Sequence, residues 1–500
     1  MRALPWLAAV LGGAAWGLCF GVAPRPLLPW VALVPLAWLA TARPAGRRRA
    51  LLIGWLHGFV HWLVAVPWIV TTIAALGGWP WLLLGLLALA LMSLILGFFH
   101  ALFVVAGQRL AARRPQLAPV LLPSLWVVLE WARGHLPSVA FPWNLAAYAW
   151  AAVPGALPLT AWIGSHGLSW LLASANVGLA LALRRRRPTL AAAAVLLPLL
   201  FLAVAGRFSW GEGQEGEERE VVVIQPDATL GGDGAQIWQD YRRLIELSAA
   251  ACDAATRDGQ GDGPLLVWPE SAAFPLVWGR SPQLAADVMR LASRGCKVLL
   301  NTPLEAPEGT YNGVLLITSD GVAGRYAKRR LVPWGEYVPL GDLMPFVGTL
   351  ARISSPFRPG TELGLMPWGE ERLGLAVCYE VTFPELVAEQ VRAGATVLVT
   401  VTNDAWYGDT AAPWQHFRAA RFRAAENRRP LVRAALTGVS GLIDARGRVV
   451  ARLGVGERDV LAGRLRGSRE LTPYARAPWL VPLGCALLLV FAIIPRRRAW

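Results

Sequence analysis

Long apolar stretches, separated by short charged or proline-rich breaks, fill the chain before about residue 210, and one more lies near its C-terminal end. The eight stretches cover approximately residues 3–22, 27–42, 51–76, 81–106, 118–134, 158–183, 189–206 and 478–495. At a rise of 1.5 Å per residue, each is long enough, or nearly so, to cross the ~30 Å hydrocarbon layer of a bilayer as a helix. The pattern therefore predicts a membrane domain of eight transmembrane helices, of which the second and fifth rest on the shortest stretches.

Between about residues 212 and 470 the pattern changes to short β-like runs that alternate with amphipathic helical stretches. The strand candidates are residues 220–225, 264–268, 297–301, 373–380 and 395–400, and the clearest helix candidates are residues 235–253 and 282–294. Alternation of this kind predicts a layered α/β domain. The expected organisation is a seven-helix membrane domain (1–210), an α/β domain (211–472), and a last transmembrane helix with a short tail (473–500).

The distribution of charged residues predicts the orientation of the chain in the membrane. Only 16% of the residues are charged and 55% are hydrophobic, which is typical of a membrane protein, and the net charge is +15. Thirteen arginines gather in four clusters at the ends of apolar stretches: Arg47 to Arg49, Arg109 with Arg113 and Arg114, Arg184 to Arg187, and Arg496 to Arg498. With eight helices, every cluster falls on one side, which the positive-inside rule makes cytoplasmic. We therefore expect both termini in the cytoplasm and the α/β domain outside it.

This arrangement excludes several function classes. The basic residues are topology signals and form no basic-aromatic surface, so nucleic-acid binding is not expected. A domain outside the cytoplasm that has no glycine-rich phosphate loop is not expected to use ATP or NADH, and no cofactor is predicted. The 25 tryptophans fit a membrane protein, because indole rings favour the membrane–water boundary.

Five cysteines occur, and one of them is a candidate nucleophile. Cys19 and Cys485 lie in apolar stretches and are expected to be packing residues, and no CxxC pair occurs, so neither a zinc site nor a disulfide framework is predicted. Cys378 ends a strand-like run and is followed by Tyr379 and Glu380. A thiol at the exit of a buried strand suits a nucleophile held by a rigid sheet, although a buried core cysteine would give the same local pattern.

Two other strand ends carry groups that a cysteine nucleophile needs. Glu270 follows an apolar run in Trp268-Pro-Glu270, and Lys328 follows a predicted hairpin at residues 314–326, with Glu336 eight residues later. A thiol requires a base for its proton and a cation for the developing oxyanion. Taken singly, these residues could equally be a loop acid, a surface lysine and a salt-bridge partner, because sequence spacing does not show that they meet.

The amino-acid sequences of these blocks resemble motifs of the nitrilase superfamily. Trp268-Pro-Glu270, Tyr326-x-Lys328 with Leu-Val-Pro-Trp334-Gly-Glu336, and Cys378-Tyr-Glu380 are similar to its three signature blocks. Asn403-Asp-Ala-Trp-Tyr-Gly408 and Pro413-Trp-Gln-His416, together with the number of apolar stretches, resemble one membrane-embedded branch, the apolipoprotein N-acyltransferases. The resemblance covers nearly the whole chain. It implies an α-β-β-α sandwich in the soluble domain and a location in the bacterial inner membrane, with the catalytic domain in the periplasm.

The resemblance also assigns roles. It implies that Glu270 is the general base, that Cys378 is the nucleophile, and that Lys328, with a backbone N–H just after Cys378, stabilises the tetrahedral intermediate. The supporting or substrate-binding positions that it implies are Glu336, Tyr379, Glu380, Trp238, Tyr326 and Trp334. The implied partners are a phospholipid acyl donor, a diacylglyceryl apolipoprotein acceptor and the lipid bilayer. The resemblance further implies a monomer without metal or cofactor.

Three further stretches carry expectations. Where the family pattern has Arg-Ala-Thr-Asn-Thr-Gly, this chain has Arg433-Ala-Ala-Leu436-Thr-Gly438, which removes an amide side chain. The apolar stretch 334–357 predicts a mobile, lipid-facing lid, although an ordinary buried loop would have the same composition. The arginine-rich run from Arg418 to Arg433 predicts a solvated helix or one that faces lipid headgroups.

Two alternatives remain open at this stage. The first keeps the fold but makes the protein a membrane-tethered amide or nitrile hydrolase. The second is a transporter or receptor whose outer domain only binds, with an ion path through Glu130, Arg133, His57, His61 and His100. A pairing of Glu130 with Arg133 on one helix face would explain those two residues without transport.

Overall fold

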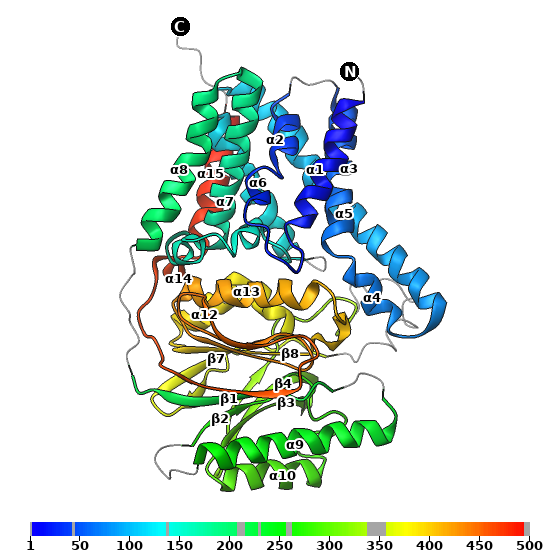
Figure 1. Cartoon of the computed structure of the whole chain (residues 1–500), viewed down its shortest axis with the longest axis vertical. Helices are drawn as coiled ribbons and strands as arrows, with labels where there is room; N and C mark the ends of the chain where they lie inside the picture. The colour runs from blue at the N-terminus through cyan, green and yellow to red at the C-terminus, as the bar shows by residue number, and fades with distance from the viewer. Residues whose placement is uncertain are drawn as a thin grey trace. The chain divides into compact units, whose positions relative to one another are not determined.

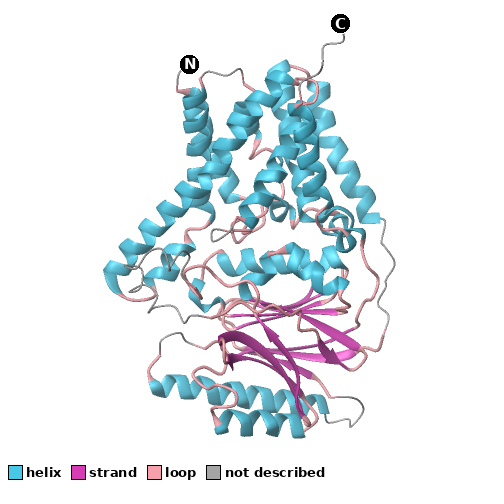
Figure 2. Cartoon of the chain, turned by 180° about the vertical axis from the view of Figure 1, so that it is seen from behind, coloured by secondary structure: helices cyan, strands magenta, loops and turns pink. Residues whose placement is uncertain are grey.

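The computed structural model describes residues 3–42, 46–136, 140–207, 216–228, 232–256, 263–337 and 357–494. The chain forms two compact units, shown from opposite sides in Figures 1 and 2. The first comprises residues 1–209, 410–415 and 477–500, and the second comprises residues 210–409 and 416–476.

In the described part of the first unit, all regular secondary structure is helical. Its α-helices are α1 (Leu4–Leu18), α2 (Val34–Ala40), α3 (Arg47–Ala65), α4 (Trp68–Ala74), α5 (Gly78–Arg113), α6 (Ala118–His135), α7 (Ala156–Arg185), α8 (Pro188–Arg207) and α15 (Leu480–Ile493), with short 3-10 helices η1 (Leu28–Trp30) and η2 (Ala146–Trp150). Glycines allow close packing between α3 and α5: a Cβ atom on Gly58 would lie 2.7 Å from the Cα atom of Gly97. Small residues at such crossings are typical of helices that pack in membranes.

Each of the eight predicted apolar stretches contains a helix, but their lengths differ. Within the described residues, α5 and α7 are long and apolar enough to cross a membrane, and α3 with α4, bent by 55°, could form a third span. The helical segments Leu4–Leu18, Leu28–Ala40, Pro188–Val204 and Leu480–Ile493 are apolar but shorter. The helical, apolar character of this unit is thus confirmed, and the number of eight crossings stays a prediction.

The second unit contains two six-stranded sheets. The first has the order β12-β1-β2-β3-β4-β5, and the second has the order β11-β10-β9-β8-β7-β6. The strands are β1 (Arg219–Gln225), β2 (Leu265–Val267), β3 (Lys297–Ala306), β4 (Gly309–Thr318), β5 (Gly321–Ala327), β6 (Met366–Trp368), β7 (Glu371–Val377), β8 (Val397–Thr402), β9 (Leu431–Ala435), β10 (Ser440–Ile443), β11 (Val449–Leu453) and β12 (Asp459–Leu465). Strands β1, β2 and β3 run parallel, as do β7, β8 and β9, and antiparallel strands flank each set.

Strand alternation explains how these sheets stack. On β1, Val221 and Val223 enter a core shared with Leu375 and Val399 of the second sheet, while Val222 and Ile224 enter another core with the helices outside. Successive strand residues point to opposite faces, so β1 is buried on both sides. Helices α9 (Gly234–Thr256) and α10 (Pro282–Ser293) cover the first sheet, and α12 (Pro384–Arg392) and α13 (Ala412–Asn427) cover the second, as Figure 1 shows. The predicted α-β-β-α sandwich is confirmed.

One cysteine expectation is wrong. Cys252 on α9 and Cys296, just before β3, form a disulfide bond, although the sequence predicted no disulfide. The partners are separated by 44 residues in sequence, so no short spacing motif reveals the pair. The other three cysteines are free and buried.

The expectation for the arginine-rich run is also wrong. Arg423, Arg429 and Arg433 are among the largest fully buried side chains of the protein, rather than solvated or headgroup-facing residues. Arg423 pairs with Glu426 at 2.7 Å, and Arg429 donates to backbone carbonyls that include those of Ala395 and Glu470. The guanidinium groups in this run therefore bind carboxylate and carbonyl oxygens inside the unit. A buried charge requires partners of this kind.

Candidate active site

Three strand ends of the sandwich bring the predicted residues to one place. Glu270 lies three residues after β2, Lys328 directly follows β5, and Cys378 directly follows β7. Glu270 and Lys328 are 6% and 1% exposed, and the Lys328 Nζ atom lies 3.5 Å from Glu270 Oε1. The charges of both residues act on the Cys378 thiol. Two facing sheets thus supply an acid, an amine and a thiol to one buried cluster.

Glu336 and Asn312 complete the polar contacts around Lys328. The ammonium group donates to Glu336 Oε1 at 2.9 Å. Asn312, on β4, donates through one amide nitrogen to Glu270 Oε1 and to Glu336 Oε1, each at 2.8 Å. The second oxygen of each carboxylate accepts a backbone N–H, from Asn403 for Glu270 and from Val332 for Glu336. Both carboxylates are therefore held at two points, as a preorganised site requires.

The lysine is kept as a cation by its neighbours. Burial by itself would lower the pKa of Lys328, but the negative charges of Glu270 and Glu336 outweigh burial and raise that pKa above its ordinary value. The side chain is therefore a permanent positive charge at neutral pH. A buried cation beside a thiol is suited to stabilising an oxyanion and is unsuited to accepting a proton.

Cys378 has an unusual backbone conformation and a protonated thiol. Its φ angle is +51°, in the left-handed region that residues other than glycine seldom occupy. Burial, followed by the charge of Glu270, raises the pKa of the thiol, whereas Lys328 and the side chain of Thr402 lower the pKa by less. The resting side chain is thus a thiol, and its activation requires a base at the moment of reaction.

Glu380 connects the lysine loop to the cysteine strand. Its carboxylate accepts the backbone N–H groups of Arg329 and Arg330, at 2.6 and 3.0 Å, and that of Val377 at 2.8 Å. The hydroxyl of Tyr326 donates to the same carboxylate. These bonds fix the residues next to Lys328 against the residue before Cys378. Tyr326 and Glu380 are both buried, and they therefore position Lys328 and Cys378 relative to each other.

The remaining predicted positions lie in different surroundings. Tyr379 is buried and packs edge-to-face against Phe383. Trp334 is 57% exposed and has a positive φ angle of 66°. Trp238 is half-exposed on α9, where it lines a hollow with Tyr241 and Arg290 on the outer helical layer. Of the predicted lid at 334–357, residues 338–356 lie outside the described residues.

Two site residues had no role in the prediction. Asn312 sits in a strand whose next five residues are apolar or glycine, and its side-chain oxygen accepts from Asn301 of the paired strand β3 at 2.8 Å. A buried amide on each of two paired strands is the signal that would have indicated a polar site. Asn403, directly after β8, contributes only its backbone N–H to Glu270, which no side-chain pattern can reveal.

The substituted position Leu436 belongs to the core. Its side chain is 3% exposed and packs in the cluster between the first sheet and helices α9 and α10. Its backbone carbonyl accepts from Asp227, and its N–H donates to Thr402. The leucine therefore replaces an amide by apolar packing at this position.

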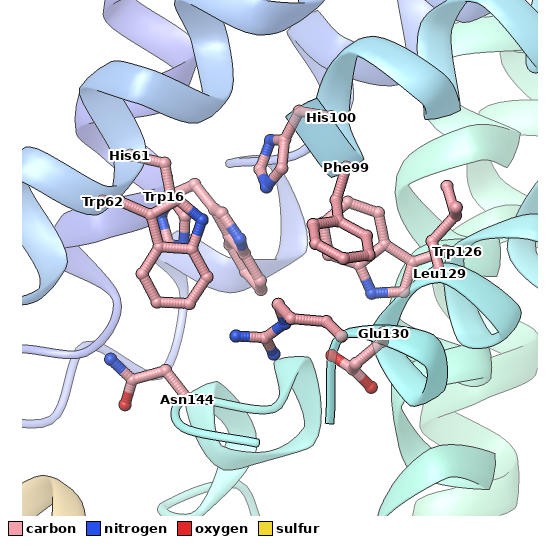
Figure 3. A pocket seen from close by; sticks show the side chains of 10 residues that line it. Trp16, His61, Trp62, Phe99, His100, Trp126, Leu129, Glu130 and Asn144 are labelled. Atoms are coloured by element: carbon pink, nitrogen blue, oxygen red, sulfur yellow. The ribbon is translucent and has the colours of Figure 1, made fainter. Parts of the chain in front are cut away.

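A small cavity in the helical unit, shown in Figure 3, is lined by polar residues that include His61, His100, Glu130 and Asn144. His57 and His100 lie 2.9 Å apart through their Nδ1 atoms, Glu130 accepts from the N–H of Ala146 and lies 3.5 Å from His166, and Arg133 stacks over the ring of Trp62. The cavity has a volume of about 30 Å³. A lipid chain does not fit in this volume, and each of these polar groups has a contact partner within the helical unit.

Family models and full-length relatives both match this chain, and they agree with one another. The family described as "Apolipoprotein N-acyltransferase N-terminal domain" matches residues 12–178, and the one described as "Carbon-nitrogen hydrolase" matches residues 228–473. An apolipoprotein N-acyltransferase of Geobacter metallireducens is 34% identical, covering 99% of this chain and 96% of the relative. One from Pseudomonas syringae pv. tomato is 32% identical, covering 98% and 97%. The solved structure of Saccharomyces cerevisiae Nit3, a member of branch 10 of the nitrilase superfamily, is 17% identical with a TM-score of 0.40, covering 57% of this chain and 98% of that chain.

Proposed function

Because the chain belongs to the apolipoprotein N-acyltransferase family, we propose that it transfers a fatty acyl chain from a membrane phospholipid, through a thioester on Cys378, to the N-terminal amine of an S-diacylglyceryl-cysteine on an apolipoprotein. The observation that best supports this proposal is the buried contact of Lys328 with Glu270 and Glu336 beside the Cys378 thiol. The enzyme acts as a monomer and requires no cofactor.

In the first half-reaction the thiol is acylated. Glu270 accepts the thiol proton while Cys378 Sγ attacks the ester carbonyl of the phospholipid, and a C–S bond forms. Lys328 and the N–H of Tyr379 stabilise the resulting oxyanion. The intermediate expels the glycerol oxygen, which takes the proton back from Glu270, and a lysophospholipid leaves. The raised pKa of the thiol makes this base necessary, since little thiolate exists beforehand.

In the second half-reaction the thioester acylates an amine. The neutral N-terminal amine of the diacylglyceryl cysteine attacks the thioester carbonyl, and Glu270 takes the proton that the nitrogen loses. The intermediate expels the thiolate of Cys378, which is reprotonated by Glu270, and the product is an amide. Glu336 holds Lys328 in place during both steps through its 2.9 Å contact. Water has to be kept from the thioester between the steps, which burial of the cluster favours.

We place the second unit in the periplasm, with both termini in the cytoplasm. The disulfide between Cys252 and Cys296 supports this location, because disulfides persist in oxidising compartments and are rare in the cytosol. The arginine clusters support it independently, since eight crossings would put all of them on the opposite side of the membrane.

Substitution of the cluster tests the proposed chemistry. Cys378→Ser is expected to abolish formation of an acyl-enzyme from phospholipid with a labelled acyl chain while the protein still inserts in the membrane. Glu270→Gln and Lys328→Ala are expected to reduce the same step by at least 100-fold. Normal N-acylation of an apolipoprotein by Cys378→Ser would refute the mechanism. Release of free fatty acid without transfer to the amine would instead favour a hydrolase.

A further inference from the structure

His416 contacts the backbone of the candidate nucleophile, Cys378. It belongs to α13, is fully buried, and its Nε2 atom is 2.9 Å from the backbone carbonyl oxygen of Cys378. A carbonyl oxygen can only accept a hydrogen bond, so Nε2 must carry the proton. The other ring nitrogen, Nδ1, faces the guanidinium of Arg433 and the carboxylate of Asp404, each at 3.1 Å. The imidazole is therefore held from both ends.

The partners of Nδ1 are themselves fixed. Arg433 donates to Asp404 Oδ2 at 2.7 Å and to the carbonyl of Val439 at 3.0 Å, and Thr402 donates to Asp404 Oδ1 at 2.8 Å. Burial and the charge of Arg433 lower the pKa of His416, so the ring is neutral, with Nδ1 accepting from Arg433. If the ring were charged, Nδ1–H would donate to Asp404. In both charge states the hydrogen bond from Nε2 to Cys378 is kept.

The contact of His416 with the carbonyl of Cys378 also affects the N–H group of Tyr379, because both groups belong to one peptide bond. The bond between Cys378 and Tyr379 is trans, since the one cis bond of the described residues is that of Pro275. In a planar trans peptide the C=O and N–H groups point in opposite directions. A donor that fixes the carbonyl of Cys378 therefore also fixes the direction of the Tyr379 N–H. Because the φ angle of Cys378 is +51°, a conformation that residues other than glycine avoid, such a constraint is needed to keep it.

We propose that His416 is a positioning residue, oriented by Asp404 and Arg433, which holds the Cys378–Tyr379 peptide so that the Tyr379 N–H points at the oxyanion formed during acylation. The inference rests on the proposed function of Cys378 as the acylated nucleophile. His416 neither exchanges a proton with substrate nor touches it. Its effect is exerted through the backbone, in the way that an oxyanion donor depends on preorganisation.

Three substitutions of His416 separate the hydrogen bond from the space that the ring fills. Glutamine places an N–H donor close to the position of Nε2, asparagine places one close to Nδ1, and leucine supplies none. We expect acylation of Cys378 by a labelled phospholipid to slow by about 100-fold in His416→Asn and His416→Leu, and by less than about tenfold in His416→Gln. The concentration of lipid that gives half-maximal rate should change little in any of them.

A second reaction of the same thiol distinguishes positioning from general damage. Alkylation of Cys378 by iodoacetamide displaces iodide and forms no oxyanion, so its rate should stay within about threefold of the wild type in all three variants. The matched control is Gln390→Leu, which removes another fully buried donor to a backbone carbonyl, that of Leu375 on the strand leading to Cys378. This control is expected to acylate at the wild-type rate.

The outcomes separate this inference from the function on which it rests. If the wild type forms no acyl-Cys378, the proposed function fails and the inference fails with it. If the wild type is acylated and all three variants match it, the inference alone is wrong. Equal losses in His416→Gln and His416→Leu, or a parallel loss of acylation and alkylation, would also overturn it. Should the leucine variant fail to fold, the comparison of glutamine with asparagine decides.

Discussion

At the scale of single residues, Asn312 connects the two carboxylates of the cluster. One amide nitrogen donates to both Glu270 and Glu336, whose carboxylates would otherwise face each other across Lys328. In Asn312→Asp the donor is lost and a third carboxylate is added. We expect acylation to fall by at least 100-fold, and more than in Asn312→Ser, which only removes the donor. Single-turnover acylation measures both, and an active Asn312→Asp enzyme would contradict the assigned contacts.

The thiol of Cys378 gives a prediction about pH. Burial and Glu270 raise its pKa, so the thiolate fraction at any given pH is smaller than that of an ordinary cysteine and saturates at higher pH. An unperturbed thiol, with a pKa of about 8.5, approaches a constant alkylation rate near pH 9.5. The iodoacetamide rate of Cys378 in lipid-free detergent should still be rising there. A plateau below pH 9 would show that the cation of Lys328 dominates instead.

At the scale of elements, the strand ends were predictable and their contacts were not. The runs that end at Glu270 and Cys378 have the apolar character of buried strands, so their placement at the edge of a sheet follows from sequence. The bonds of Glu380 to the N–H groups of Arg329, Arg330 and Val377 depend on how two loops meet across the sandwich, which local patterns do not determine. His416 belongs to the motif Pro413-Trp-Gln-His416, but only the folded structure shows its contact with the carbonyl of Cys378.

The arginine run shows a second limit at this scale. A sequence of charged residues on a helix predicts a solvated face, yet Arg423 is fully buried because Glu426, three residues later on α13, pairs with it. The i,i+3 spacing was visible in the sequence. Burial was not, since it depends on how the side chains of α13 pack in the folded protein.

The disulfide between Cys252 and Cys296 gives a prediction about stability. It joins α9 to the start of β3 and closes a loop of 44 residues, for which the chain-entropy model gives a stabilisation of about 4 kcal/mol. The double variant Cys252→Ala/Cys296→Ala should lower the melting temperature of the purified protein by several degrees with little change in acylation rate. Cys485→Ala, which truncates a free cysteine on α15, is the control. An unchanged melting temperature for the double variant would show that the bond does not form.

At the scale of the whole molecule, the location of the two units is testable by labelling. Ser319 is exposed in the turn between β4 and β5, and Arg48 is exposed at the start of α3. In spheroplasts, a membrane-impermeant maleimide should label Ser319→Cys and should label Arg48→Cys only after the membrane is permeabilised. This labelling pattern is the one expected from the disulfide and from the positive-inside rule. The reverse pattern would invert the proposed topology.

The most direct test of the account is mass spectrometry of the purified, full-length protein incubated with phospholipid and without an amine acceptor. If Glu270, Lys328 and Cys378 act together, the cysteine-containing peptide should gain the mass of one fatty acyl chain, and addition of a diacylglyceryl-cysteine peptide should remove that mass and produce an N-acylated peptide. An unmodified Cys378, or an acyl group on another residue, in an active preparation would contradict the central claim.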